Sequence, residues 1–314
     1  MLMALALIPA IVLLVVIYLF DRKDKEPFGL LMGLFFAGAA TVISAIILEL
    51  IGEVLLVPFT YFPVLKSILD CFFVIGPAEE LGKYLVLWLI TWRNKHFNYS
   101  FDGIVYAVFV SLGFAALENI SYVFQHGFAT GILRMFTSVP GHTCFAVLMG
   151  FFYSKSKYAK AIARKGKFRL YHLLSLFVPI VVHALYDALL MVGEASGVDG
   201  VVVLCALLWI GFLLALFGTC IALVIVCSKK TSVLLSEIIR LLSTDQKSWA
   251  TGHVHAESLT SVISAATVEA RDQKVRSGTA HPVVIHLFGF SVVTAEPRIL
   301  SWLITSHEQQ FKSK

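Results

Sequence analysis

Long apolar runs separated by short polar connections dominate residues 1–228. A bilayer crossing requires about 20 predominantly apolar residues in a helix. The pattern predicts transmembrane helices at about Met1–Phe20, Phe28–Leu50, Val64–Trp92, Phe101–Phe124, Gly141–Tyr153, Tyr171–Val192 and Val201–Cys227. We therefore expect an all-α fold, a polytopic transmembrane helical bundle of about seven spans with a small cytoplasmic C-terminal extension.

The connections between these runs are mostly short. Two are longer: Gln125–Ser138, which we expect to be a loop, and Ser154–Arg169, which we expect to be a strongly basic linker. Small residues in the second run are expected to permit close contact with other helices, namely Gly29, Gly33, Gly38, Ala39 and Ala40.

Basic residues are unevenly distributed among the connections. The second, fourth and sixth connections contain one basic residue, Arg134. Cytoplasmic loops of membrane proteins are enriched in Lys and Arg, so the basic connections predict the cytoplasmic side. We expect an integral protein of the cell membrane with its N-terminus outside and its C-terminus in the cytoplasm. The first, third and fifth connections carry Arg22, Lys23, Lys25, Arg93, Lys95, Lys155, Lys157, Lys160, Arg164, Lys165, Lys167 and Arg169.

Composition agrees with a membrane protein. Hydrophobic residues make up 58% and charged residues 14%, against about 45–50% and about 25% in soluble domains; the mean hydropathy is +0.85. The net charge of +5 is explained by the basic connections, so no nucleic-acid partner is expected. The cysteines lie inside apolar runs without CxxC spacing, which indicates neither a disulfide framework nor a thiolate metal site.

Residues 229–314 differ in character from the rest. They are polar, with scattered charges, and we expect a second region, a cytoplasmic tail that is weakly folded or disordered, after a transmembrane domain at 1–228. Thr231–Leu242 is compatible with an amphipathic helix, and Pro282–Val293 with a strand or a buried run. The histidines of this region match no zinc-binding spacing.

The stretch Gly76–Lys83, GPAEELGK, places charges in the middle of an apolar run. A charge at the bilayer centre costs about 2.5–3.5 kcal/mol on insertion scales, and such residues commonly mark functional sites. Glu79 and Lys83 are four residues apart, so the lysine can neutralise this carboxylate. Glu80 points about a third of a turn away and is free to serve another partner.

Four further polar residues interrupt other apolar runs. They are Glu118, His142, His183 and Asp187, and Asn119 follows the first of them. The span count places them and the two glutamates at one depth, between the midplane and the external face. His183 and Asp187 are four residues apart and share a helix face. We expect these side chains, contributed by four spans, to meet in one cavity.

Two chemistries fit such a cavity, and both hydrolyse an amide. A glutamate acts as general base on water, with a histidine and a second acid in support; alternatively, His142, His183 and a carboxylate such as Asp187 bind zinc, whose bound water becomes the nucleophile. A third interpretation treats each acid as a structural hydrogen-bond partner between helices. The same residues also suit a proton-coupled transporter or a non-enzymatic sensor, although we find no internal duplication of the transporter kind.

These residues resemble the motifs of the PrsW family of intramembrane proteases. Glu79-Glu80-x-x-Lys83 resembles its EExxK motif, Phe114-x-x-x-Glu118 its FxxxE motif and His183-x-x-x-Asp187 its HxxxD motif. The resemblance covers about residues 1–228 and implies that they form a transmembrane protease-like domain. The family is similar in arrangement to the type II CAAX prenyl proteases.

The resemblance implies a metalloprotease that cuts membrane-anchored proteins such as anti-sigma factors, with a zinc cofactor or with metal-free glutamate chemistry. We therefore expect an intramembrane peptidase of metallo- or glutamate type, whose partners are a membrane-anchored protein substrate and the lipid bilayer. The expected catalytic residues are Glu79, Glu80, Glu118, His183 and Asp187, with Lys83 and Asn119 in support and His142, His183 and Asp187 as metal ligands.

Overall fold

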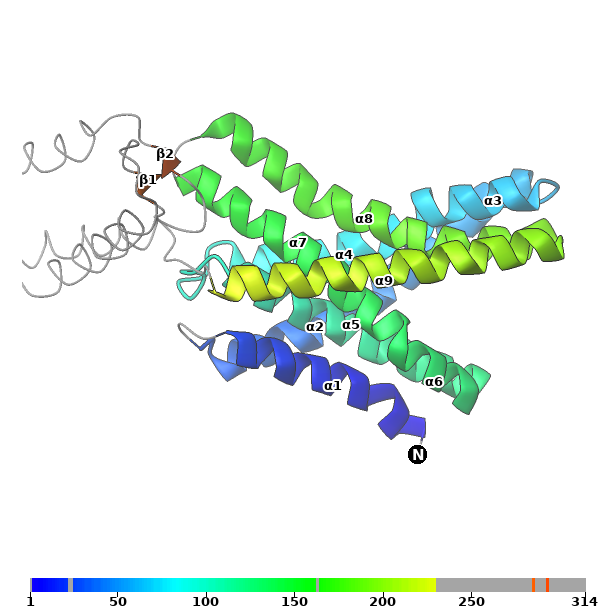
Figure 1. Cartoon of the computed structure of the whole chain (residues 1–314), viewed down its shortest axis with the longest axis horizontal. Coiled ribbons are helices and arrows are strands. Elements are labelled where there is room, and N and C mark those ends of the chain that lie inside the picture. Colours follow the sequence, from blue (N-terminus) through cyan, green and yellow to red (C-terminus); the bar gives the residue numbers. More distant parts are fainter. Residues whose placement is uncertain (1, 22–24, 162–163, 230–283, 286–291, 294–314) are drawn as a thin grey trace, which may run out of the picture. The chain divides into compact units, whose positions relative to one another are not determined.

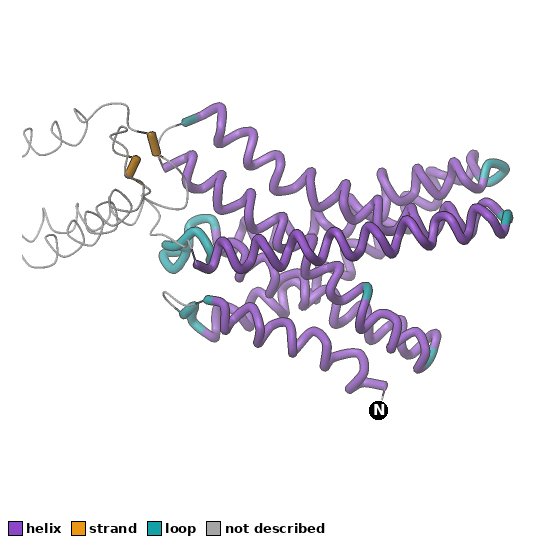
Figure 2. Tube along the Cα trace, viewed as in Figure 1, coloured by secondary structure: helices purple, strands orange, loops and turns teal. Residues whose placement is uncertain are grey.

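The computed structural model describes residues 2–21, 25–161, 164–229, 284–285 and 292–293. Contacts along the chain define two units, Met1–Thr231 and Ser232–Lys314. The first unit is built from helices, and most of their connections lie at its two ends (Figure 2). This confirms the prediction of an all-α polytopic bundle for the described residues of the first unit.

Nine α-helices and two short helical turns follow one another in the first unit's described residues (Figure 1). The 3₁₀ turn η1 is Val57–Phe59 and the π-helical turn η2 is Cys71–Ile75. The α-helices are α1 (Leu2–Phe20), α2 (Phe28–Leu56), α3 (Pro63–Asp70), α4 (Gly76–Thr91), α5 (Asp102–His126), α6 (Phe128–Phe136), α7 (Ser138–Ala161), α8 (Lys165–Ser196) and α9 (Asp199–Lys229).

Six helical runs of the described residues are long and apolar enough to cross a membrane. The expected third crossing is helical from Pro63 to Thr91, but η2 divides it into α3, of 8 residues, and α4, of 16 residues. Neither part alone reaches the length of a bilayer crossing. A crossing by α3, η2 and α4 together stays a prediction.

Two connections differ from expectation because both contain helix. The expected loop Gln125–Ser138 contains α6, which begins after Gly127 at φ +84°, a backbone conformation that favours glycine. The expected linker Ser154–Arg169 is largely helical, since α7 runs to Ala161 and α8 begins at Lys165. Alanine and lysine are strong helix formers, so loss of hydrophobicity does not end a helix outside the bilayer.

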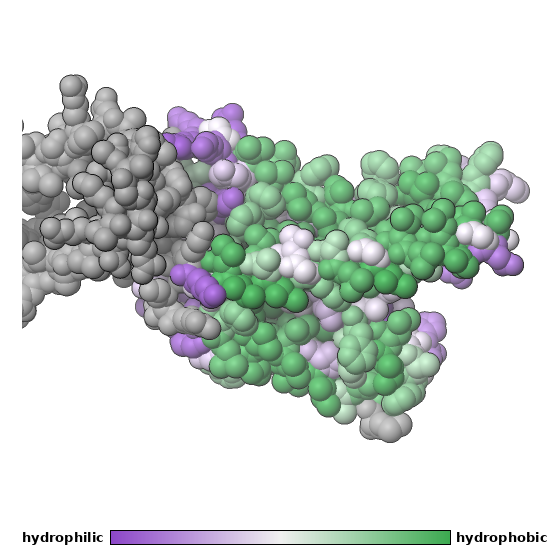
Figure 3. Space-filling view, viewed as in Figure 1, coloured by the Kyte–Doolittle hydropathy of each residue, from purple (hydrophilic) through white to green (hydrophobic). Residues whose placement is uncertain are grey.

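Helix α5 forms the centre of the first unit. In the most apolar 18-residue stretch of α5, 83% of the residues are buried, against 6% in α9. Helix α9 therefore presents most of its surface outward. Figure 3 shows hydrophobic side chains over the visible face of the helices and hydrophilic ones near their two ends. This is the surface expected of a protein surrounded by lipid.

Glycines allow α2 to pack closely against α5. A Cβ atom on Gly38 would collide with the carbonyl oxygen of Val110, and one on Gly113 with that of Phe35. The prediction of close contact is therefore confirmed at Gly38. It is wrong at Gly29 and Gly33, where a Cβ would meet no other atom of the described residues within 4 Å.

The second unit contains one described pair of strands, both in the stretch Pro282–Val293. Strand β1 (Val284–Ile285) pairs antiparallel with β2 (Val292–Val293), with Val284 opposite Val293. The predicted amphipathic helix at Thr231–Leu242 and the weakly folded character of the tail fall outside the described residues.

Candidate active site

The two glutamates and the lysine of α4 form a buried charge cluster. Glu79 is 6% exposed, Glu80 0% and Lys83 1%. The Lys83 ammonium lies 3.0 Å from Glu79 Oε2 and 2.8 Å from Glu80 Oε1. One cation therefore offsets part of the charge of two carboxylates, where the spacing alone predicts a pair with Glu79.

Helix α8 brings His183 against this cluster. Its Nδ1 lies 3.1 Å from Glu80 Oε1, and its Nε2 lies 3.3 Å from Asp187 Oδ2 and 3.9 Å from Glu79 Oε2. The close crossing of α4 and α8 is possible because Gly76 lies at the contact. A Cβ there would come 3.0 Å from the carbonyl oxygen of Ile180.

Helix α7 contributes His142, which contacts both Lys83 and Glu118. Lys83 Nζ lies 3.2 Å from its Nδ1, and Glu118 Oε2 of α5 lies 2.9 Å from its Nε2. An ammonium can only donate, so Nδ1 accepts and Nε2–H donates to Glu118. The imidazole rings of His142 and His183 are 5.3 Å apart between centroids.

Aromatic rings enclose these groups. Phe145 stacks on His183 with centroids 4.6 Å apart, and the Phe114 ring lies 3.8 Å from Lys83 Nζ. Phe114, the first residue of the FxxxE-like motif, therefore contacts the cation of the EExxK-like motif.

Asn119 lies next to Glu118 in sequence but is engaged elsewhere. Its amide donates to the carbonyl oxygen of Ala6 in α1 at 3.0 Å and accepts from Arg134 Nε at 2.9 Å. The supporting role expected for Asn119 in the reaction stays a prediction that these two contacts do not favour.

Arg134 is a neighbour of the site that the sequence interpretation missed. It comes from α6, in the region expected to be a loop, and its Nη2 lies 2.8 Å from Glu118 Oε2. The available signal was its position as the single basic residue of the second, fourth and sixth connections.

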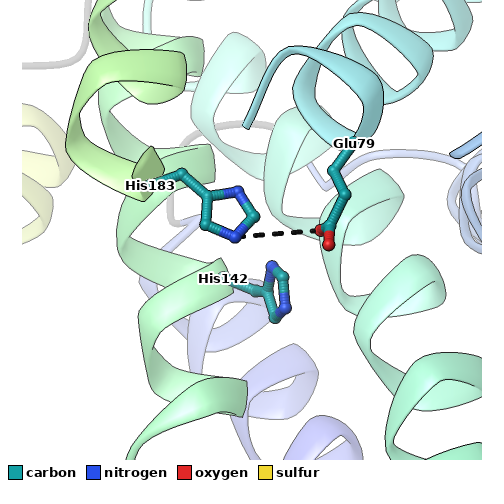
Figure 4. Close-up of side chains that lie close together, drawn as sticks. All are labelled: Glu79, His142 and His183. Carbon is teal, nitrogen blue, oxygen red and sulfur yellow. Dashed lines mark ion pairs between the residues drawn. The ribbon is translucent and has the colours of Figure 1, made fainter. Parts of the chain in front are cut away.

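Three of these side chains are arranged as a metal site would require. Glu79, His142 and His183 are buried and each offers a ligand atom within 4.8 Å of the others (Figure 4). Two imidazoles and one carboxylate form a common catalytic zinc set. On each imidazole, the nitrogen on the side away from this group faces a carboxylate: His142 Nε2 faces Glu118, and His183 Nδ1 faces Glu80. Carboxylates commonly occupy this position around metal-bound histidines. The residues therefore fit a metal. Asp187, the ligand expected from the sequence, lies 3.3 Å from His183 Nε2 but is not part of this group, and its role as a ligand stays a prediction.

The fold and this centre together define a class: helical membrane proteins with a buried acid–imidazole centre of the kind used in hydrolysis. Residues 26–216 match the family described as PrsW family intramembrane metalloprotease. The chain belongs to this family, as its motifs predicted, and it is an intramembrane protease by membership. All the site residues named above lie within the matched range.

Curated relatives agree with this assignment. The chain is 34% identical to Protease PrsW of Clostridioides difficile (strain 630) over 210 residues, which cover 65% of this chain and 85% of that protein. It is 32% identical to Protease PrsW of Geobacillus kaustophilus (strain HTA426) over 203 residues, or 64% and 84% of the two chains. For Protease PrsW of Bacillus subtilis (strain 168) the identity is 35% over 182 residues, or 58% and 79%. No solved structure gives a significant match.

Proposed function

We propose that the chain hydrolyses a peptide bond of a membrane-anchored protein, such as a regulator of the anti-sigma-factor kind, at the centre formed by α4, α5, α7 and α8. The observation that carries this proposal is the continuous buried network that joins Glu79, Glu80, His142 and His183. Family membership supports the reaction class. It lends no support to the alternative of a proton-coupled transporter or sensor.

Glu79, His142 and His183 are the residues that would hold the metal, which we propose to be zinc. A bound zinc ion supplies a water of lowered pKa and polarises the carbonyl of the substrate. The donor set of two histidines and one glutamate supports this choice. A reaction without metal, in which a glutamate activates water directly, is the alternative that chelation tests.

Glu80 is the proposed general base. Its Oε1 accepts from Lys83 and His183, while its Oε2 has no hydrogen-bond partner among the described residues. That oxygen accepts a proton as water attacks the carbonyl carbon, and it returns the proton to the amine nitrogen as the C–N bond breaks. Glu118 orients the His142 ring at Nε2. Asp187 is a further acid at the centre, 3.3 Å from the His183 nitrogen that also faces Glu79.

The experiment uses the full chain in proteoliposomes with a membrane-anchored reporter. We expect Glu80→Ala and His183→Ala to remain folded and to lower cleavage by at least about 100-fold, the lower range for loss of a general base. Glu53→Ala is the matched control, because Glu53 is an acid on α2 that pairs with Lys66 outside the network. Cleavage at the wild-type rate by both site variants would remove the assignment.

Metal dependence is tested separately. Elemental analysis of the purified protein is expected to find about one zinc per chain, and chelation is expected to abolish cleavage until zinc is restored. Full activity after complete removal of metal would instead establish the glutamate mechanism.

A further inference from the structure

Helix α6 has an exposed apolar face and one side chain, Arg134, that reaches the active centre. It is nine residues long and packs against α1, α5 and α7. Phe128, Leu133 and Phe136 are 49%, 59% and 66% exposed. Its one charged side chain, Arg134, is 14% exposed and turns away from this apolar surface.

Arg134 contacts three residues of α5 at once. Its Nη2 lies 2.8 Å from Glu118 Oε2, its Nε donates to Asn119 Oδ1 at 2.9 Å, and its guanidinium carbon lies 3.9 Å from the centroid of the Tyr122 ring. A planar guanidinium can bond a carboxylate and an amide while stacking on an aromatic ring, whereas an ammonium cannot make this combination. The geometry therefore uses the shape of arginine as well as its charge.

A single oxygen atom joins Arg134 to the centre. Glu118 Oε2 lies 2.8 Å from Arg134 Nη2 and 2.9 Å from His142 Nε2. The Glu118 side chain is 17% exposed, and its ion pair with Arg134 holds the same oxygen that faces His142. The orientation of the His142 ring, and hence the direction of Nδ1, depends on this carboxylate.

We propose that Arg134 is a positioning residue of the active centre, which acts through Glu118 to hold His142 in the orientation that directs Nδ1 toward Glu79 and His183. This inference deepens the proposed function and rests on it. Among the described residues, Arg134 forms no hydrogen bond or ion pair with Glu79, His142 or His183. It acts on His142 through the Glu118 carboxylate. A merely structural role, the attachment of α6 to α5, predicts different measurements.

The test compares Arg134→Gln and Arg134→Lys in the full chain with Lys66→Gln as matched control. Lys66 is also a cation paired with a glutamate, at 3.0 Å from Glu53, but its pair lies outside the network. Zinc affinity is measured with zinc alone by competition with a chelating dye. The kcat and KM values are measured with the membrane-anchored reporter, and helix content and thermal stability are recorded for each variant.

We expect Arg134→Gln to weaken zinc binding by about 10–100-fold, the range for loss of a residue that orients a metal-bound histidine. It should lower kcat while KM changes less than about twofold, because ground-state substrate binding is untouched. Arg134→Lys should recover part of both losses, since it restores the charge without the guanidinium fork. Lys66→Gln should match the wild type.

The inference is overturned when folded Arg134→Gln keeps the zinc affinity and kcat of Lys66→Gln, or when it changes KM alone. Should Arg134→Gln fail to fold, Arg134→Lys decides by the same two measurements, and wild-type values for both overturn the inference. If the wild-type chain binds zinc but cleaves nothing, the proposed reaction is overturned, and the role of Arg134 is then tested by the zinc affinities of the variants alone. If the wild-type chain cleaves without zinc, the role of Arg134 is tested by the kcat values of the variants alone.

Discussion

Lys83 shows how much of one residue's environment follows from the sequence. Spacing of four residues correctly predicts its pair with Glu79, because side chains at i and i+4 share a helix face. Its contacts with His142 and with the Phe114 ring come from α7 and α5. Such contacts depend on how distant helices pack, which no local pattern contains.

Removal of Lys83 should be costly to stability. Lys83→Met leaves two carboxylates, Glu79 and Glu80, without their shared cation in a buried site. We expect the free energy of unfolding to fall by about 3–5 kcal/mol, as for other broken buried ion pairs. Denaturant titration in micelles, followed by circular dichroism, measures this change.

Lys66→Met provides the control for this prediction. Its ion pair with Glu53 is partly exposed, with side chains 24% and 54% accessible, and such pairs contribute about 1 kcal/mol or less. Equal losses in the two variants would show that the buried network contributes no more than a surface pair.

At the scale of elements, the contact between α2 and α5 depends on glycine at particular positions. The sequence offers several small residues in α2, yet Gly38 meets α5 and Gly29 meets no other described residue. Hydropathy could not distinguish them, because the choice depends on which face of α2 turns inward. The short helix α6 and the turn η2 were missed for a related reason, since neither changes the apolar pattern.

Gly113→Ala should loosen the α2–α5 contact. The added methyl group would collide with the Phe35 carbonyl oxygen, and overpacking of a tight interface costs about 1–3 kcal/mol. Thermal denaturation in detergent should therefore show a lower midpoint for Gly113→Ala than for the wild type.

The matched variant is Gly29→Ala, where a Cβ would meet no atom of the described residues within 4 Å. Alanine also has the higher helix propensity, so this variant should be as stable as the wild type or slightly more stable. A loss of stability equal to that of Gly113→Ala would contradict the packing described for α2 and α5.

For the whole molecule, the alternation of basic and non-basic connections predicted much of the architecture. It placed Glu79, Glu118, His142 and His183 at similar depth before any contact was known, and the structure brings these four side chains into one network. Their catalytic roles stay predictions. The grouping of Glu79 with His142 and His183 was not accessible from the sequence, because it depends on angles between helices. The role of Asp187 as a metal ligand stays a prediction.

The orientation of the chain in the membrane is a prediction of the same charge pattern. A reporter fused after Lys229 should be found on the cytoplasmic side and one fused at the N-terminus outside, since Lys and Arg are retained in the cytoplasm. Protease protection of right-side-out vesicles measures both positions. Protection of the N-terminal reporter together with exposure of the C-terminal one would reverse the assignment.

The second unit should be dispensable for cleavage. The family match ends at residue 216 and the network uses residues between Glu79 and Asp187, within the unit Met1–Thr231. A chain that stops after Thr231 should therefore cleave the reporter at a rate within about twofold of the full chain, a difference well under 1.4 kcal/mol in the barrier. An inactive but folded truncated chain would assign the tail a part in the reaction.

The burial of Glu79 and Glu80 has a consequence for the form in which a substrate is cut. Both residues are less than 10% exposed, whereas an α-helix with its side chains is about 10–12 Å wide. We therefore expect an intact helix to be too broad to bring a backbone carbonyl to carboxylates that are so little exposed. The scissile segment must first unwind, so sequences rich in glycine or other weak helix formers will be cut soonest.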